Sequence, residues 1–239
     1  MEEKELKTSL KQRIIIAVIA VVMVGSILAS YAAIVINGSK GSSTADSGVS
    51  EEKIAQYSEE YTEKLAKFKE VSASDFKTFL PYKSEVKAYN ETAANANGVQ
   101  TRDLLAGTGR KLTEDDTDYL AYYIGWCADE TIFDSSLDNI SSPTAFDKAL
   151  DASLGMIEGW NVGVIGMRLG GVREVTVPGE LAYGSSMEIC GGYDKPLKFL
   201  VMAVANEDPL KTAAAELDIA YLKLQYAYYG IDYEEVYGN

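Results

Sequence analysis

The stretch from Leu154 to Gly184 constrains the fold more than any other part of the chain, because it predicts a short helix, a turn and a strand in direct succession. Apolar side chains recur in its first half at steps of three and four residues, as on one face of a helix. They are Met156, Ile157, Trp160, Val164 and Met167. Gly159, Gly163 and Gly166 weaken such a helix in isolation, so we expect it to pack closely on something flat, most simply a sheet.

The second half of this stretch predicts the turn and the strand. Gly170 and Gly171 end the helix and turn the chain. The segment from Val172 to Val177 alternates as a strand does, and Pro178 ends it because proline cannot donate a hydrogen bond to a sheet. Leu181 to Gly184 then forms a loop that carries a tyrosine.

Short motifs stand in a fixed order on both sides of Trp160. They are Gly98 to Gly109, Tyr123 to Gly125, Phe133 to Ser136, Met156 to Trp160, Gly163-Val164, Gly166-Met167, Pro178, Leu181 to Gly184, and Leu197 to Val201. This series resembles the FKBP-type peptidyl-prolyl isomerases from about Gly98 to Asn206. An ordered series of motifs is far more specific than any one of them.

The resemblance implies an α+β fold, in which a twisted antiparallel sheet of about five strands wraps around the short helix of Trp160. A transmembrane helix and flanking helical extensions are expected outside this domain. The expected organisation is a cytoplasmic N-terminus at 1–13, a transmembrane signal anchor at 14–36, a flexible linker at 37–50, a helical extension at 51–97, the isomerase domain at 98–207, and a C-terminal helix with a tyrosine-rich tail at 208–239.

The resemblance also implies a pocket for a prolyl peptide bond. We expect Trp160 to form its floor, Asp134 to face the amide carbonyl, and Tyr183 to donate its hydroxyl to a substrate carbonyl. The catalytic candidates are Asp134, Tyr183, Trp160, Tyr123 and Phe133, and the substrate-binding candidates are Met156, Ile157, Phe199, Phe146 and Ile189. For a single aromatic an ordinary core position is the better interpretation, and only the ordered series favours a site.

Asp134 is informative because a carboxylate directly after a buried aromatic is costly unless it has a partner or a purpose. A turn residue that caps Ser136 is the alternative interpretation. The loop from Ser185 to Pro196 departs from the family, because the double proline of an I-P-P-like segment is missing; Ile189 is expected to stand in for its apolar contact. Met156 also replaces the usual valine with a more adaptable side chain.

The two cysteines, Cys127 and Cys190, permit a disulfide outside the membrane. The first is expected on a strand near the pocket and the second on the divergent loop, so a bond would tether that loop. Two reduced thiols are the alternative. Two cysteines without any histidine are too few for structural zinc, so we expect neither a metal nor another cofactor.

The run from Ile14 to Ile36 contains no charged residue and is long enough to cross a bilayer as a helix. A secretory signal peptide is the alternative, although the run is long for one. Lysines and an arginine precede the run, and the first cation after it is Lys40. The positive-inside rule then places the N-terminus in the cytoplasm and the isomerase domain outside the cell membrane.

Helical segments are expected on both sides of the domain. Glu51 to about Glu70 carries an apolar stripe with Ser50 as N-cap, and a second helix is expected to start at Ser74 or Asp75. Pro209 is expected to open a C-terminal helix. We expect the apolar faces of these helices to pack within the chain. A homodimer through the helical extension is the alternative.

The expected strands are Thr101 to Leu105, Asp118 to Cys127 and Leu197 to Val201, with Phe133-Asp134 in a turn and Phe146 in an edge segment. The net charge of −14 and the lack of a basic patch argue against nucleic acid as a partner. The predicted function is a membrane-anchored peptidyl-prolyl cis-trans isomerase that assists the folding of exported, proline-containing polypeptides. The alternatives are a proline-peptide-binding or chaperone module with little isomerase activity, and a membrane-tethered scaffold.

Overall fold

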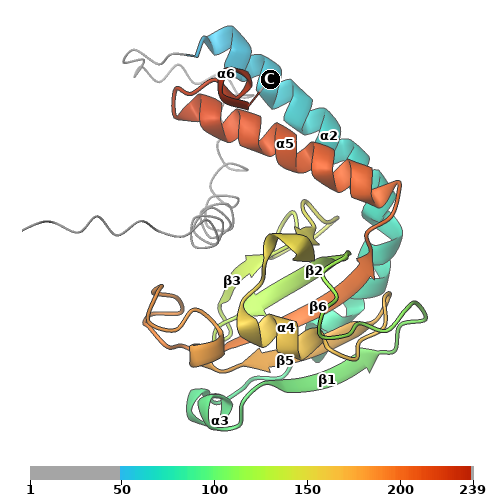
Figure 1. Cartoon of the computed structure of the whole chain (residues 1–239), viewed down its shortest axis with the longest axis vertical. Coiled ribbons are helices and arrows are strands. Elements are labelled where there is room, and N and C mark those ends of the chain that lie inside the picture. Colours follow the sequence, from blue (N-terminus) through green and yellow to red (C-terminus); the bar gives the residue numbers. More distant parts are fainter. Residues whose placement is uncertain (1–48, 238–239) are drawn as a thin grey trace, which may run out of the picture. The chain divides into compact units, whose positions relative to one another are not determined.

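The computed structural model describes residues 49–237, and its centre is a six-stranded antiparallel sheet (Figure 1). Five strands follow one another in the order β1-β5-β6-β2-β3, and β4 pairs with β2. Their bounds are Gln100–Leu105 (β1), Tyr119–Trp126 (β2), Ile132–Ser135 (β3), Leu150–Asp151 (β4), Val172–Val177 (β5) and Leu197–Ala205 (β6). Phe133 and Asp134 therefore lie in a strand, and the prediction of a turn at these residues is wrong.

The sheet is buried on both faces. Along β2 every residue from Tyr119 to Gly125 is buried, and alternate side chains enter two different apolar clusters. Tyr119, Ala121 and Tyr123 belong to the cluster beneath α4 (Glu158–Val164), which we call the front cluster. Leu120, Tyr122 and Ile124 belong to the cluster beneath the long helices, which we call the back cluster. Successive side chains of a strand point to opposite faces, so this division follows directly from the pleat.

The front of the sheet carries α4, the predicted helix of Trp160. A Cβ added to Gly159 would lie 2.1 Å from Val177 Cγ1, and one added to Gly163 would lie 2.3 Å from Val175 Cγ1. These glycines therefore allow the helix to lie directly on β5, which confirms the expected close packing on a sheet. The helix ends at Val164, earlier than predicted, because the chain turns at Gly166 with φ +82°.

Two long helices, α2 (Glu51–Phe79) and α5 (Leu210–Tyr228), pack side by side and supply the back cluster (Figure 1). Ser50 caps α2 by accepting a hydrogen bond from the Lys53 amide at 3.3 Å, as predicted. The helix continues through Ser74 instead of breaking there, because Phe76 and Phe79 extend its apolar stripe onto the sheet. The predicted intramolecular packing of this stripe is confirmed.

Shorter helices connect these elements. They are η1 (Leu80–Glu85), α3 (Glu91–Ala96), η2 (Ala152–Leu154), η3 (Gly179–Leu181) and α6 (Tyr233–Tyr237). Pro81 lies in the first turn of η1, where the missing amide proton costs nothing. Pro209 is the N-cap of α5 rather than its first helical residue.

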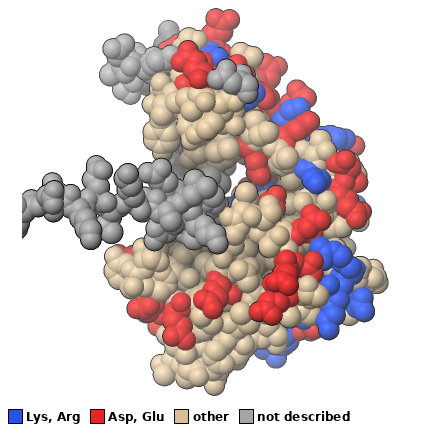
Figure 2. All heavy atoms as spheres, viewed as in Figure 1, with Lys and Arg blue, Asp and Glu red and all other residues tan. Residues whose placement is uncertain are grey.

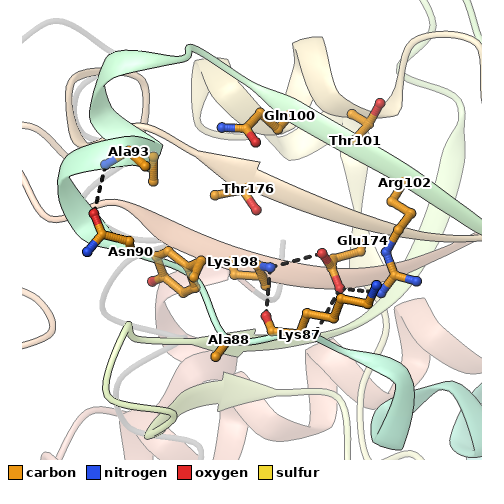
Figure 3. A pocket seen from close by; sticks show the side chains of 12 residues that line it. Lys87, Ala88, Asn90, Ala93, Gln100, Thr101, Arg102, Glu174, Thr176 and Lys198 are labelled. Carbon is orange, nitrogen blue, oxygen red and sulfur yellow. Dashed lines mark hydrogen bonds and ion pairs between the residues drawn. The ribbon is translucent and has the colours of Figure 1, made fainter.

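The segment before β1 crosses the back face of β5 and β6 and encloses a polar cavity of about 370 Å³ (Figure 3). Glu174, buried on β5, accepts hydrogen bonds from Lys198 Nζ at 2.9 Å, from Arg102 at 2.8 Å and from the Lys87 amide at 3.1 Å. The carboxylate is thus fully paired, as a buried charge requires. This cluster fastens the crossing segment to the sheet.

No helix within residues 49–237 is long and apolar enough to cross a membrane. The predicted spanning segment at 14–36, the N-terminus at 1–13 and nearly all of the linker at 37–50 lie outside the described residues.

Candidate active site

Four aromatic side chains from four elements converge on the front of the sheet. Trp160 on α4 lies edge-on to Tyr123 on β2, with ring centroids 5.8 Å apart, and to Phe199 on β6, with centroids 5.4 Å apart. Phe133 on β3 packs edge-on against Phe199 at 5.7 Å. Trp160 is only 3% exposed, and its indole Nε1 donates a hydrogen bond to the Tyr119 hydroxyl at 3.2 Å. The floor of the candidate pocket is therefore fixed in position before any substrate binds.

Glycine at position 125 explains how Phe133 reaches this cluster. A Cβ at Gly125 would lie 2.5 Å from Phe133 Cζ, because the phenyl ring lies across the backbone of the neighbouring strand. The two strands pair directly there, with Gly125 opposite Asp134. The spacing Tyr123-Ile124-Gly125 therefore places a residue of the aromatic cluster two positions before the glycine over which the Phe133 ring lies.

Asp134 is the centre of the polar part of the site. Its carboxylate accepts a short hydrogen bond from the Tyr123 hydroxyl and a bond of 2.8 Å from the Ser135 amide. Lys148 Nζ lies 2.8 Å from Asp134 Oδ1 and 5.7 Å from the centroid of the Tyr123 ring. The Asp134 side chain is only 8% exposed, so these contacts replace the water that a buried carboxylate loses. The alternative role as a cap of Ser136 is not what the structure shows.

Tyr183 lies at the edge of the aromatic cluster in the segment after β5. Burial, with a smaller contribution from the negative charge of Asp134, raises the pKa of Tyr183 to about 12, so its hydroxyl keeps its proton at neutral pH. No residue among those described accepts a hydrogen bond from this hydroxyl. It is therefore free to donate to a bound carbonyl.

Three further predicted contacts, Met156, Ile157 and Ile189, are partly buried against the same front cluster. Ile157 immediately precedes α4, and Ile189 lies on the divergent loop. The structure thus brings nine of the ten predicted pocket residues to one face of the sheet.

Phe146 is the exception, and its interpretation as a wall of the pocket is wrong. It is completely buried in the back cluster, where its ring stacks on Tyr122 with centroids 3.9 Å apart and contacts Phe76 and Phe79 of α2. Because α2 covers the back of this sheet, a second apolar cluster exists there, and Phe146 belongs to it although its neighbours in sequence belong to the site.

Sequence reasoning missed Lys148, the only lysine or arginine between Lys111 and Arg168. The available signal was its isolation: Lys148 is a single cation in a long interval of a strongly acidic chain, and it lies between two motifs of the site. Tyr119 was interpreted only as a strand residue, although it holds Trp160 in place. No signal in the sequence identified that bond.

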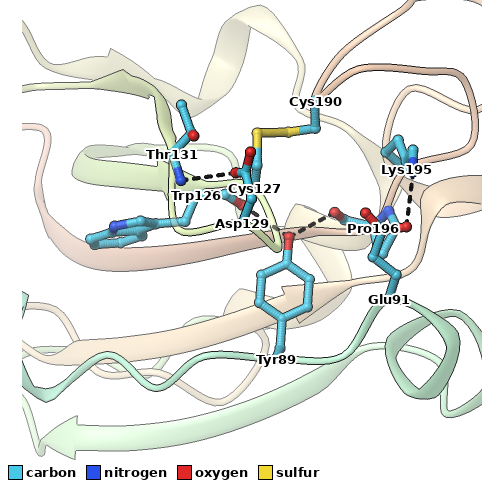
Figure 4. The surroundings of a disulfide bond; sticks show 9 residues. All are labelled: Tyr89, Glu91, Trp126, Cys127, Asp129, Thr131, Cys190, Lys195 and Pro196. Atoms are coloured by element: carbon cyan, nitrogen blue, oxygen red, sulfur yellow. Dashed lines mark hydrogen bonds and ion pairs between the residues drawn. A yellow bond between two sulfur atoms is a disulfide. The ribbon is translucent and has the colours of Figure 1, made fainter.

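The cysteines are bonded: Cys127, directly after β2, joins Cys190 on the divergent loop, with their Cα atoms 5.5 Å apart (Figure 4). The predicted disulfide is confirmed. The end of the loop is held separately, because the Tyr89 hydroxyl lies 2.8 Å from the Pro196 carbonyl oxygen and 3.1 Å from that of Trp126. The loop that carries Ile189 is therefore fixed to the domain at two points without the prolines of the family.

The arrangement offers groups that bind and polarise an amide. No group of three or more histidine, cysteine, aspartate or glutamate residues in the described part of the chain is arranged to hold a metal ion. What it provides is a closely packed aromatic floor, a buried and paired carboxylate, and one protonated tyrosine hydroxyl at its edge.

Comparison with known proteins identifies the family. The family model described as FKBP-type peptidyl-prolyl cis-trans isomerase matches residues 109–204. The chain is 34% identical over 110 residues to an FK506-binding protein of Neisseria meningitidis serogroup B, spanning 45% of this chain and 92% of that protein. It is 36% identical over 103 residues to FK506-binding protein 4 of Neurospora crassa, spanning 43% of this chain and 21% of that protein.

A solved peptidyl-prolyl cis-trans isomerase from Pseudomonas syringae pv. tomato aligns with a TM-score of 0.36 and 23% identity, over 56% of this chain and 94% of that one. The Neisseria protein is more than 30% identical and is covered almost completely. The chain therefore belongs to the family of FKBP-type peptidyl-prolyl cis-trans isomerases.

Proposed function

We propose that the protein is a membrane-anchored isomerase that assists the folding of exported polypeptides at the outer face of a cell membrane. The observation that carries this proposal is the bond between Cys127 and Cys190, because disulfides persist in oxidising compartments and are rare in the cytosol. The uncharged run from Ile14 to Ile36, with its preceding cations, supports an anchor of the orientation that such a location needs.

The chemistry required is rotation about one bond. A peptide bond resists rotation by about 18–20 kcal/mol because of its partial double-bond character, and no proton or nucleophile is needed to cross this barrier. Catalysis then means binding the twisted amide more tightly than the planar one. A twisted amide has lost its resonance and part of its carbonyl dipole, so a dry aromatic pocket favours it over the planar form.

The residues of the site divide this work. The Trp160 indole, held by Tyr119, supports the proline ring, and Phe133, Phe199 and Ile157 exclude water around it. The Tyr183 hydroxyl donates to a carbonyl of the substrate. Asp134, paired with Tyr123 and Lys148, faces the amide carbonyl, whose reduced dipole in the twisted state interacts less unfavourably with a carboxylate.

Catalysis is tested with the full chain in sealed phospholipid vesicles and a short peptide with one X-Pro bond. The parent accelerates isomerisation, and the double variant Asp134→Ala, Tyr183→Phe loses most of that acceleration. Tyr193→Phe is the matched control, because Tyr193 lies exposed on the same loop as Ile189. A folded parent that binds proline peptides without accelerating isomerisation would refute the enzyme and favour the binding module.

Topology is tested separately by protease protection of the same chain in sealed, right-side-out membrane vesicles. Digestion of the isomerase domain from outside supports the proposed location. Protection of the domain, with digestion only after the vesicles are lysed, refutes it without affecting the assignment of the catalytic site. A homodimer through the helical extension stays a prediction, to be measured by sedimentation of the detergent-solubilised chain.

A further inference from the structure

Large apolar side chains are exposed together where α5 ends and α6 follows. Tyr229 is 69% exposed, Tyr237 55% and Val236 51%. We define the apolar tip as these three residues together with the similarly exposed Tyr228 and Ile231. In Figure 2 uncharged side chains gather over the C-terminal part of α5, with acidic side chains at the margin. The isomerase site lies on the catalytic domain and uses none of these residues.

The apolar tip is held in a fixed arrangement. Tyr226, Tyr233 and Tyr237 pack on one another with ring centroids 5.0 to 5.9 Å apart. Between α5 and α6, Asp232 accepts a hydrogen bond from the Tyr57 hydroxyl at 2.9 Å and pairs with Lys53 at 2.5 Å. The tip is therefore fastened to the first turns of α2, and its exposed aromatic side chains lie on an ordered part of the chain.

The start of α2 is also where the chain arrives from the predicted membrane segment. Only twelve residues, 37–48, separate Ile36 from the first described residue, Val49. A chain of twelve residues reaches at most about 40 Å. Asp232 binds Tyr57 and Lys53 near the start of α2, so the apolar tip lies beside the end of the described chain that the linker joins to the predicted anchor.

We propose that the apolar tip lies in the headgroup layer of the membrane that the N-terminal segment crosses. The proposal rests on the anchor of the proposed function. Tyrosine suits this layer because its ring is apolar and its hydroxyl is polar, and it is enriched where membranes meet water. Glu235 lies next to the tip without a basic partner among the described residues and opposes binding to anionic lipid, so the partner is a zwitterionic surface.

A second copy of the chain is the less favoured occupant. A symmetric dimer brings the same patch of both copies together. Glu235 of each copy, which has no basic partner among the described residues, would then approach its counterpart, and like charges at an interface disfavour association.

The test uses the full chain in phosphatidylcholine vesicles with bromine-labelled acyl chains, which quench tryptophan at close range. Tyr229→Trp places a reporter in the tip. Tyr193→Trp is the matched control, because Tyr193 is 57% exposed on the loop beside the catalytic pocket. The parent, with Trp126 and Trp160, supplies the baseline. We expect quenching above baseline for Tyr229→Trp only, and less quenching when anionic lipid is added.

Absence of quenching at position 229 in a chain that resists alkaline extraction from the vesicles overturns the proposal and leaves the anchor intact. Equal quenching at 229 and 193 overturns it in favour of a domain that lies on the membrane. A tryptophan at position 229 that becomes less accessible to a water-soluble quencher as the protein-to-lipid ratio rises, without quenching by brominated lipid, overturns the proposal in favour of a second copy. Release of the chain by alkaline extraction refutes the anchor itself.

Discussion

Replacing Asp147 by asparagine is expected to stabilise the protein at neutral pH. Asp147 lies between Phe146, buried at the back of the sheet, and Lys148, which belongs to the site at the front. Its Oδ1 is buried and has no hydrogen-bond partner among the described residues. Burial raises the pKa of Asp147 from 3.8 to about 6, although the positive charge of Lys148 opposes the shift. The fold therefore tolerates the protonated carboxyl better than the carboxylate.

The sign follows from proton binding. Between pH 4 and pH 6 the native state holds a proton on Asp147 that the unfolded chain has released, so stability falls as pH rises through this range. A difference of about two pKa units corresponds to about 3 kcal/mol at pH 7. Because the side chain is partly open to water, we expect about 1–3 kcal/mol. Asparagine carries no charge at any pH and removes this penalty.

The assay is urea unfolding of the detergent-solubilised full chain at several pH values from 4 to 8, with Asp115→Asn as a control at an exposed aspartate. Asp147→Asn is expected to gain stability over the parent above pH 6 and to match it near pH 4. A variant that is less stable than the parent at pH 7, or whose difference from the parent is the same at pH 4 and pH 7, would refute the reasoning.

Three further predictions concern the site, the back of the sheet and the loop. Lys148→Met leaves Asp134 without its cation, so it is expected to lower the free energy of unfolding by about 1–2 kcal/mol and to lower kcat/KM. Lys148→Arg keeps the cation and is expected to keep the stability and the kcat/KM of the parent. Urea unfolding and peptide isomerisation measure the two quantities. Phe146→Ala is expected to cost about 3–5 kcal/mol while kcat/KM per folded molecule stays near that of the parent; a selective loss of activity would return Phe146 to the pocket. Reducing the bond between Cys127 and Cys190, which closes a loop with a sequence separation of 63, is expected to cost up to about 4 kcal/mol and to change the preference among X-Pro peptides; equal stability with and without reductant would count against this.

The convergence of the candidate site residues was largely predictable because they belong to ordered motifs, and each motif fixes a position on the sheet. The position of Phe146 was not predictable, because the face of the sheet to which a side chain points depends on strand pairing. A shift of the pairing by one residue moves the side chain to the opposite face. Its bridge to Leu137 turns it toward α2, and no local pattern contains that information. Lys148 was missed for a related reason, since its role depends on reaching Asp134 across the sheet edge rather than on a motif of its own.

The helices show what periodicity predicts and what it does not. The start of α2 at its Ser50 cap was predictable, because a cap is a local hydrogen bond. Its continuation to Phe79 was not, because Ser74 and Asp75 are typical helix-starting residues and only packing of Phe76 and Phe79 on the sheet outweighs that preference. The short helix α6 was also missed, because its tyrosines are ordered by contacts with Tyr226.

The back cluster also determines when during synthesis this protein can complete its fold. Phe68 and Phe79 belong to the first described helix, whereas Leu210 and Leu217 belong to α5, near the end of the chain. Contacts between such distant parts form late and slow the folding reaction. As the chain leaves the ribosome, N-terminus first, the back of the sheet lacks the side chains of α5 until that helix has emerged, and such unfinished sheets are prone to aggregate. A protein that we propose to be a folding helper therefore passes through a client-like stage of its own, which ends only when α5 packs on the sheet.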